Sequence, residues 1–221
     1  MTYTGDVRVG GPSDTRVIAL TNGSQVTLTK IAVGPFENNS YLLIDGTGQA
    51  LLIDAAAEAE QLLAMIGDTP VAKIVTTHQH QDHWQALAAV QAATGAATVA
   101  HPADAPGIPV PTSELVEDGG TVTFGDTHLA VTHLIGHTPG SIALCLDADG
   151  SEPHLFTGDC LFPGGPGRTT TPETFNSLMT GLEDKVFSRL PDTTWIYPGH
   201  GNDSTVGAER PHLQEWRERG W

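Results

Sequence analysis

The sequence is poor in positive charge, in cysteine and in long apolar segments. Only 10 of its 221 residues are Lys or Arg, against 26 Asp or Glu, so the formal net charge is −16. A nucleic-acid-binding protein needs a basic surface to neutralise phosphates, and this composition therefore argues against a nucleic-acid partner. Two cysteines do not supply a disulfide framework.

No apolar run is long enough to cross a membrane. The longest runs, such as residues 62–66 and 142–146, are far shorter than the roughly 20 residues that a transmembrane helix needs. Residues 1–13 contain no apolar segment of the kind found in secretory signals. The sequence therefore predicts a cytoplasmic protein without a membrane partner.

The composition changes near residue 25. Residues 1–24 are rich in Gly, Pro, Thr and Asn, which predicts an N-terminal arm with one short strand near residues 16–20. Residues 25–221 show no internal repeat or linker, and this length fits a single domain. Hairpin signals mixed with single helices predict an α/β layered fold whose sheets are not purely parallel.

Periodicity and turn signals place the expected elements along this domain. The expected strands are residues 25–33, 40–45, 50–54, 71–76, 98–100, 121–124, 128–134, 141–147, 154–157 and 193–197. The expected helices are residues 57–66, 84–94, 172–190 and 208–219, with a long Gly-rich loop over 158–171. Thr171 is the expected N-cap of the third helix and Gly95 the expected end of the second.

Three of the ten histidines and one aspartate gather in six residues directly after an apolar strand: His78, His80, Asp82 and His83. Neutral imidazole and carboxylate are the natural ligands of zinc and similar metals. A His-x-His pair in extended chain can direct both rings at one ion, and the Asp-His pair at the following turn can face a second point. The cluster predicts a metal site at the end of a strand, where open α/β sheets place their ligands.

Three more potential ligands stand singly at turns that follow expected strands. His137 lies in the segment GHTPGS, Asp159 in TGD and His200 in PGHG. Each turn is flanked by Gly or Pro. Taken with the first cluster, these residues predict a metal centre assembled from several loops.

In combination, the four motifs resemble those of the metallo-β-lactamase superfamily, and the resemblance runs from about residue 25 to residue 217. It implies an αββα sandwich, with two mixed β-sheets flanked by helices and metal ions at one edge between the sheets. The segments Gly167-Arg168-Thr169 and Tyr197-Pro198-Gly199-His200-Gly201 look most like those of the glyoxalase II group, the hydroxyacylglutathione hydrolases.

The resemblance implies two divalent metal ions, with zinc preferred and iron or manganese as alternatives. It assigns one ion to His78, His80 and His137, the other to Asp82, His83 and His200, and a bridging role to Asp159. Such a pair of ions would share a hydroxide that attacks a small-molecule thioester of the hydroxyacyl-thiol type.

Two further roles follow from the same comparison. Asp54 matches an acidic residue that ends an early strand and orients a ligand imidazole. Arg168 matches a basic residue that contacts a glutathione carboxylate. Independently of the resemblance, Asp82 or a metal-bound water could accept the proton released during the attack. Thr170 replaces an aromatic residue of the group, and one helix is expected after His200, so the thiol can differ from glutathione.

Three alternatives remain open at this point. Persulfide dioxygenases share the fold and much of the motif set, and their single iron would be held by His78, His137 and Asp159. Imidazole and carboxylate suit iron as well as zinc. A lactone or ester hydrolase would use the same hydroxide, and a metal-binding module without turnover would keep the ligands but lack activity.

Overall fold

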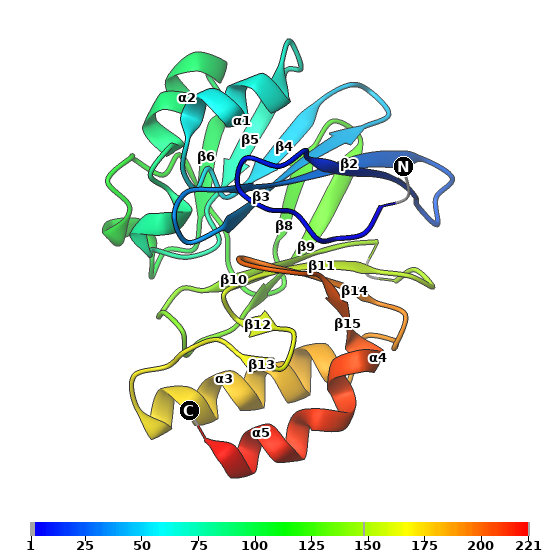
Figure 1. The fold of residues 1–221 in the computed structure, drawn as a ribbon, viewed down its shortest axis with the longest axis vertical. Coiled ribbons are helices and arrows are strands. Elements are labelled where there is room, and N and C mark those ends of the chain that lie inside the picture. Colours follow the sequence, from blue (N-terminus) through cyan, green and yellow to red (C-terminus); the bar gives the residue numbers. More distant parts are fainter. Residues whose placement is uncertain (1–2, 148, 221) are drawn as a thin grey trace.

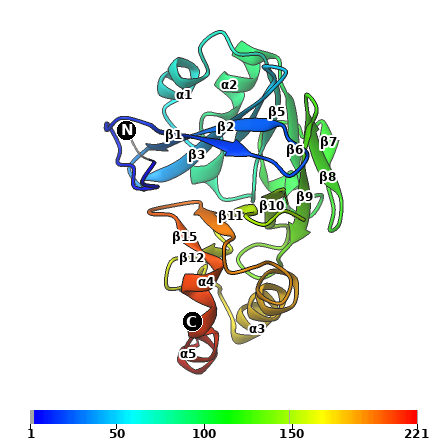
Figure 2. The same ribbon diagram turned by 90° about the vertical axis from the view of Figure 1, so that its right-hand side faces the viewer.

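The computed structural model describes residues 3–147 and 149–220. Two β-sheets pack face to face, with α1 and α2 covering one outer face and α3 and α5 the other (Figures 1 and 2). This arrangement confirms the predicted αββα sandwich.

The first sheet has seven strands in sequence order, antiparallel from β1 to β4 and parallel from β4 to β7. Its strands are β1 (Asp14–Ala19), β2 (Gln25–Val33), β3 (Asn38–Asp45), β4 (Ala50–Ile53), β5 (Val71–Val75), β6 (Ala97–Ala100) and β7 (Glu114–Leu115). The short strand expected in the N-terminal arm is β1, which pairs with β2 over its whole length.

The second sheet has six strands in the order β15-β14-β11-β10-β9-β8, and only the β11–β14 pair is parallel. Its strands are β8 (Thr121–Phe124), β9 (Thr127–His133), β10 (Ile142–Leu146), β11 (His154–Gly158), β14 (Trp195–Pro198) and β15 (Ser204–Thr205). Both sheets are mixed, as predicted. The expected Gly-rich loop contains a small hairpin, β12 (Leu161–Phe162) with β13 (Gly165–Pro166).

The helices are shorter than the sequence pattern predicts. They are α1 (Ala59–Ile66), α2 (Leu87–Thr94), α3 (Pro172–Leu182), α4 (Val206–Glu209) and α5 (Leu213–Arg219), with 3₁₀ turns at Gln81–His83, Ala105–Gly107 and Arg210–His212 and a π-helical turn at Glu183–Phe187. The amide of Ala86 donates to Ala55 O at 3.0 Å, so the second helix starts after it. Pro211 lacks an amide proton and lies in the turn that divides the last expected helix.

Both predicted helix ends are confirmed. The Thr171 hydroxyl accepts a hydrogen bond from the amide of Thr174 in a reciprocal capping box, with Pro172 at the first helical position. Gly95 ends α2 in the left-handed conformation at φ 68°.

Three hydrophobic clusters fill the three spaces between the layers. One contains side chains of both sheets, such as Leu28 and Phe156, and lies between them. The second joins the first sheet to α1 and α2, and the third joins the second sheet to α3 and α5. Among the described residues no helix is long and apolar enough to span a membrane. Both cysteines are buried free thiols, in agreement with the sequence analysis.

Candidate metal centre

The predicted ligands lie in four loops that meet at one edge of the sandwich. These loops follow β5, β9, β11 and β14, so strands of both sheets direct their ends toward the same place. A hydrogen bond from the Ile142 amide to Thr77 O, 3.0 Å long, ties the two sheets together there. An isolated bridge between Asn38 and His200 adds a second link.

The structure brings all seven predicted ligands together in overlapping groups. In each group, one nitrogen or carboxylate oxygen per residue lies within 4.8 Å of the others. The groups are His78, His80 and His137; His78, His83 and Asp159; and Asp82, His83 and His200. Because His78, His83 and Asp159 join the two outer groups, the arrangement offers two adjacent positions for cations.

Hydrogen bonds to the outer nitrogens set the direction of the rings. Nδ1 of His137 donates to Arg168 O at 2.7 Å, and Nδ1 of His200 donates to Phe36 O at 2.8 Å. Nδ1 of His83 lies 2.8 Å from Asp54 Oδ2. Each of these contacts directs Nε2 toward the centre, where that nitrogen can act as a metal ligand.

Asp54 contacts one predicted ligand directly and a second one through Thr77. Its carboxylate accepts hydrogen bonds from the Thr77 amide and hydroxyl, both at 2.8 Å, in addition to the contact with His83. The Thr77 hydroxyl also lies 3.1 Å from Nδ1 of His78. Because that hydroxyl donates to Asp54, it accepts from His78. Asp54 is almost fully buried and has φ 57°, an uncommon conformation for a residue other than glycine.

Unsatisfied polar atoms test whether these residues fit a metal. Nε2 of His78, Nε2 of His137 and Oδ1 of Asp159 are buried and have no hydrogen-bond partner among the described residues. An unpaired buried polar atom is costly, and most such atoms have a partner. Because these three atoms belong to the ligand groups above, a divalent cation fits the site.

The electrostatics of the site favour cation binding. Burial, together with the neighbouring imidazoles, lowers the pKa of His78, and burial lowers the pKa of His137, so both rings are neutral near pH 7. Despite its burial, Asp159 has a pKa held well below the ordinary value by His83 and His200. The hydrogen bond from His200, with a second from Asn38, lowers the pKa of Asp82. Despite burial, Asp159 and Asp54 raise the pKa of His83, and Asp159 and Asp82 raise that of His200 to about 9. Because metal binding requires neutral imidazoles, a cation has to displace a proton from each of these two rings.

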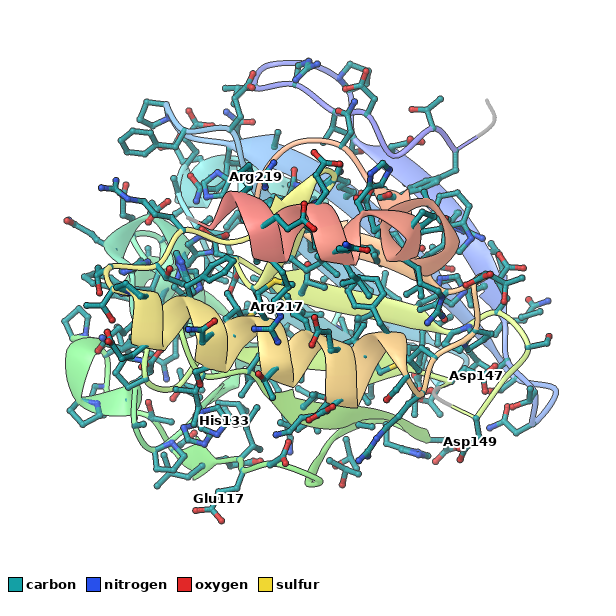
Figure 3. All side chains as sticks on the ribbon, turned by 90° about the horizontal axis from the view of Figure 1, so that it is seen from below. Glu117, His133, Asp147, Asp149, Arg217 and Arg219 are labelled. Atoms are coloured by element: carbon teal, nitrogen blue, oxygen red, sulfur yellow. The ribbon has the colours of Figure 1, made fainter. Side chains whose placement is uncertain are left out.

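A cavity of about 480 Å³ opens beside His137 and Asp159. Its wall is formed by Phe162 and the Gly- and Pro-rich segment 163–167, and two arginines also line it. Arg168, the predicted substrate-binding residue, is one of them; Arg219 at the end of α5 is the other (Figure 3).

The sequence analysis missed one side chain in this site. Asn38 is buried at the start of β3, and its amide donates to Asp82 Oδ2 at 3.0 Å. The same nitrogen lies 3.4 Å from Nε2 of both His83 and His200. An Asn-Asn pair at the start of an apolar strand is the only local signal of this position.

Comparison with known proteins agrees with this fold. The sequence profile of the metallo-beta-lactamase superfamily matches residues 33–200. The chain therefore belongs to this superfamily of metallo-hydrolases.

Two sequence relatives illustrate the range within the superfamily. A hydroxyacylglutathione hydrolase of Polaromonas sp. is 35% identical over 168 residues, which are 75% of this chain and 62% of the relative. A probable metallo-hydrolase of Bacillus subtilis is 33% identical over 203 residues, which are 82% of this chain and 93% of the relative.

Two solved structures are similar to this chain in fold and in sequence. TTHA1623, crystallised in a di-iron-bound form, has a TM-score of 0.69 and 32% identity, covering 82% of this chain and 96% of its own. ETHE1 from Myxococcus xanthus has a TM-score of 0.74 and 28% identity, covering 84% of this chain and 82% of its own.

Proposed function

We propose that this chain is a cytoplasmic dinuclear metallo-hydrolase that cleaves a small-molecule thioester of the hydroxyacyl-thiol type. The observation that carries the proposal is the pair of adjacent ligand groups, with Asp159 between them: its carboxylate lies 3.6 Å from Nε2 of His137 in one set and 3.3 Å from Nε2 of His83 in the other. A mononuclear site would not need the second set, formed by Asp82, His83 and His200. A di-iron-bound structural relative supports the same reading.

The ligand assignments that we propose follow this geometry. One metal ion would be held by His78, His80 and His137 and the second by Asp82, His83 and His200, and Asp159 would contribute to both. Zinc is the preferred metal, and iron or manganese suits the same donors. When bound, the two cations supply an activated water and positive charge for the oxyanion that develops at the carbonyl.

The protein side chains orient these groups and handle the released proton. Asp54 would hold the His83 ring directly and the His78 ring through Thr77, which keeps each Nε2 directed inward. Asp82 is our candidate for the proton acceptor, but its lowered pKa makes it a weak base and favours its ligand role. A thiolate is a good leaving group, so no strong general acid is required.

The cavity beside the site would receive the thiol half of the substrate. Arg168 is exposed at its rim, and its planar guanidinium can bind a carboxylate with two hydrogen bonds. We propose that it anchors an acidic group of the thiol, as the similarity to a hydroxyacylglutathione hydrolase suggests. In that case Arg168→Gln raises KM for S-acyl glutathione while kcat changes little, and Arg168→Lys recovers part of the loss.

The test combines metal analysis with a substrate panel. We expect the purified chain to hold about two equivalents of zinc or iron and to hydrolyse S-hydroxyacyl thioesters in preference to lactones and β-lactams. His80 is exposed, so His80→Asn should remove one metal without unfolding the chain. We expect kcat/KM to fall by more than the roughly 10–100-fold cost of losing an outer hydrogen-bond partner.

His128→Asn is the matched control, because His128 is also exposed but belongs to none of the ligand groups. It should retain two metals and full activity. One iron per chain with persulfide-dependent oxygen uptake would instead support the dioxygenase alternative. A chain that binds two metals but turns over lactones and no thioester would refute the proposed substrate class.

A further inference from the structure

Asp104 is a fully buried carboxylate outside the ligand groups. It lies four residues after β6, at the start of the 3₁₀ turn Ala105–Gly107. Its Oδ2 accepts hydrogen bonds from the Gln79 amide at 2.9 Å and the Thr138 hydroxyl at 2.5 Å, and its Oδ1 accepts one from the Gly140 amide at 2.7 Å. Three donors on one buried carboxylate make a strong and specific contact.

These donors belong to the two loops that carry one complete ligand group. Gln79 stands between His78 and His80, and Thr138 directly follows His137. Asp104 therefore bonds to the chain directly beside all three members of the group His78, His80 and His137. Asp82 and His83 of the other outer group follow in the same loop, in the 3₁₀ turn Gln81–His83, where Asp104 makes no side-chain hydrogen bond among the described residues. We propose that Asp104 is a positioning residue that sets the spacing of the first metal site; the inference rests on the proposed function.

The turn that contains Asp104 lies close to the loop that follows His137, and a second contact holds this loop. A Cβ at Gly140 would lie 2.6 Å from the Asp104 backbone nitrogen, so no larger residue fits there without a shift. In the same loop, Pro139 O accepts a hydrogen bond from Nε2 of His133 at 2.8 Å. The His133 ring, labelled in Figure 3, stacks on the ring of His101 with centroids 3.8 Å apart.

The ligand group of Asp82, His83 and His200 depends on other contacts. Its rings are held by Asp54 and by Phe36 O, and its carboxylate by Asn38. Loss of the Asp104 carboxylate should therefore affect the two metal positions unequally. Asp104→Asn keeps the volume but presents an NH₂ group where the carboxylate accepts, so one of the two loops loses its hydrogen bond.

The matched control is Asp45→Asn. Asp45 is also buried, and it accepts hydrogen bonds from the amides of Thr47, Gln49 and Asp126 and from the Thr47 hydroxyl. It ends β3, whereas Asn38 of the site begins that strand, about 23 Å away at the usual rise per residue. Both variants should lose thermal stability in the metal-free state.

The decisive measurement is a zinc titration of the full chain against a chelating indicator. We expect the wild type to bind two zinc ions, Asp104→Asn to bind one of them at least about tenfold more weakly, and Asp45→Asn to match the wild type. Thr138→Val removes a single donor and should weaken the same ion to a smaller degree, which tests the inference if Asp104→Asn does not fold.

Two results would overturn the inference while leaving the proposed function intact. The first is that Asp104→Asn and Thr138→Val each bind two zinc ions with the affinities of the wild type. The other is equal weakening of both ions by Asp104→Asn, which would show a general structural role. A wild-type chain that binds no zinc, iron or manganese would overturn the proposed function, and the inference with it.

Discussion

The buried ion pair between Lys30 and Asp203 allows a sharp test of the packing near the metal centre. Lys30 Nζ lies 2.7 Å from Asp203 Oδ1 and donates to Gly5 O at 2.7 Å and Gly201 O at 2.8 Å. Both charged side chains are at most 2% exposed. The pair thus joins the N-terminal segment, β2 and the loop that follows His200.

Burial lowers the pKa of Lys30 and raises that of Asp203, and the opposite charge of the partner partly offsets each shift. Lys30→Met would leave the Asp203 carboxylate buried without its counter-ion, which costs about 3–5 kcal/mol. For a chain of this length 1 kcal/mol corresponds to roughly 2–4 °C, so the melting temperature should fall by about 6–20 °C. Lys30→Met/Asp203→Leu removes both charges and should recover part of this loss.

Lys73→Met is the control, because Lys73 Nζ lies 2.5 Å from Glu114 Oε2 but the glutamate is 44% exposed. Surface pairs contribute about 0–1 kcal/mol. Urea unfolding of the metal-free wild type and of the three variants measures how much each substitution changes the free energy of unfolding. The reasoning is refuted if Lys30→Met costs no more than Lys73→Met, or if the double variant is less stable than the single one.

Three further predictions concern other parts of the chain. Burial lowers the pKa of His154 to about 4 from 6.5, so only the unfolded chain gains a proton between these values. The free energy of unfolding should fall by up to about 3 kcal/mol as the pH falls from 6.5 to 4. In urea titrations, His154→Asn should make the free energy of unfolding depend less on pH over this range. Thr171→Ala should cost about 1 kcal/mol by urea unfolding, against almost nothing for Thr170→Ala. Chelation should lower the melting temperature, and zinc at about 100 times its Kd should restore about 2.7 kcal/mol per site in calorimetry.

Local patterns explain why much of the fold could be predicted. Apolar runs such as those of β4 and β10 are buried along their whole length, because each strand is covered on both faces. The predicted arm strand was recognisable, but its pairing with β2 was not, since pairing depends on residues distant in the sequence. The division into an arm and a domain stays a prediction.

Lys30 shows how a pattern can mislead. It continues the face of β2 on which Val26 and Leu28 enter the core between the sheets, where a lysine is unexpected. Only the approach of Asp203 and two carbonyls makes its burial acceptable. No spacing in the sequence indicates that contact.

The sequence by itself indicated the seven side chains that the structure brings together, because His and Asp at strand ends in these spacings are typical of a metal site. The tertiary structure alone decided how these side chains are held. The contacts of Asn38, Asp104 and the Phe36 carbonyl join segments from separate loops of the two sheets. Hydrogen bonds of this kind arise when the sheets pack, so no local pattern of residues encodes them.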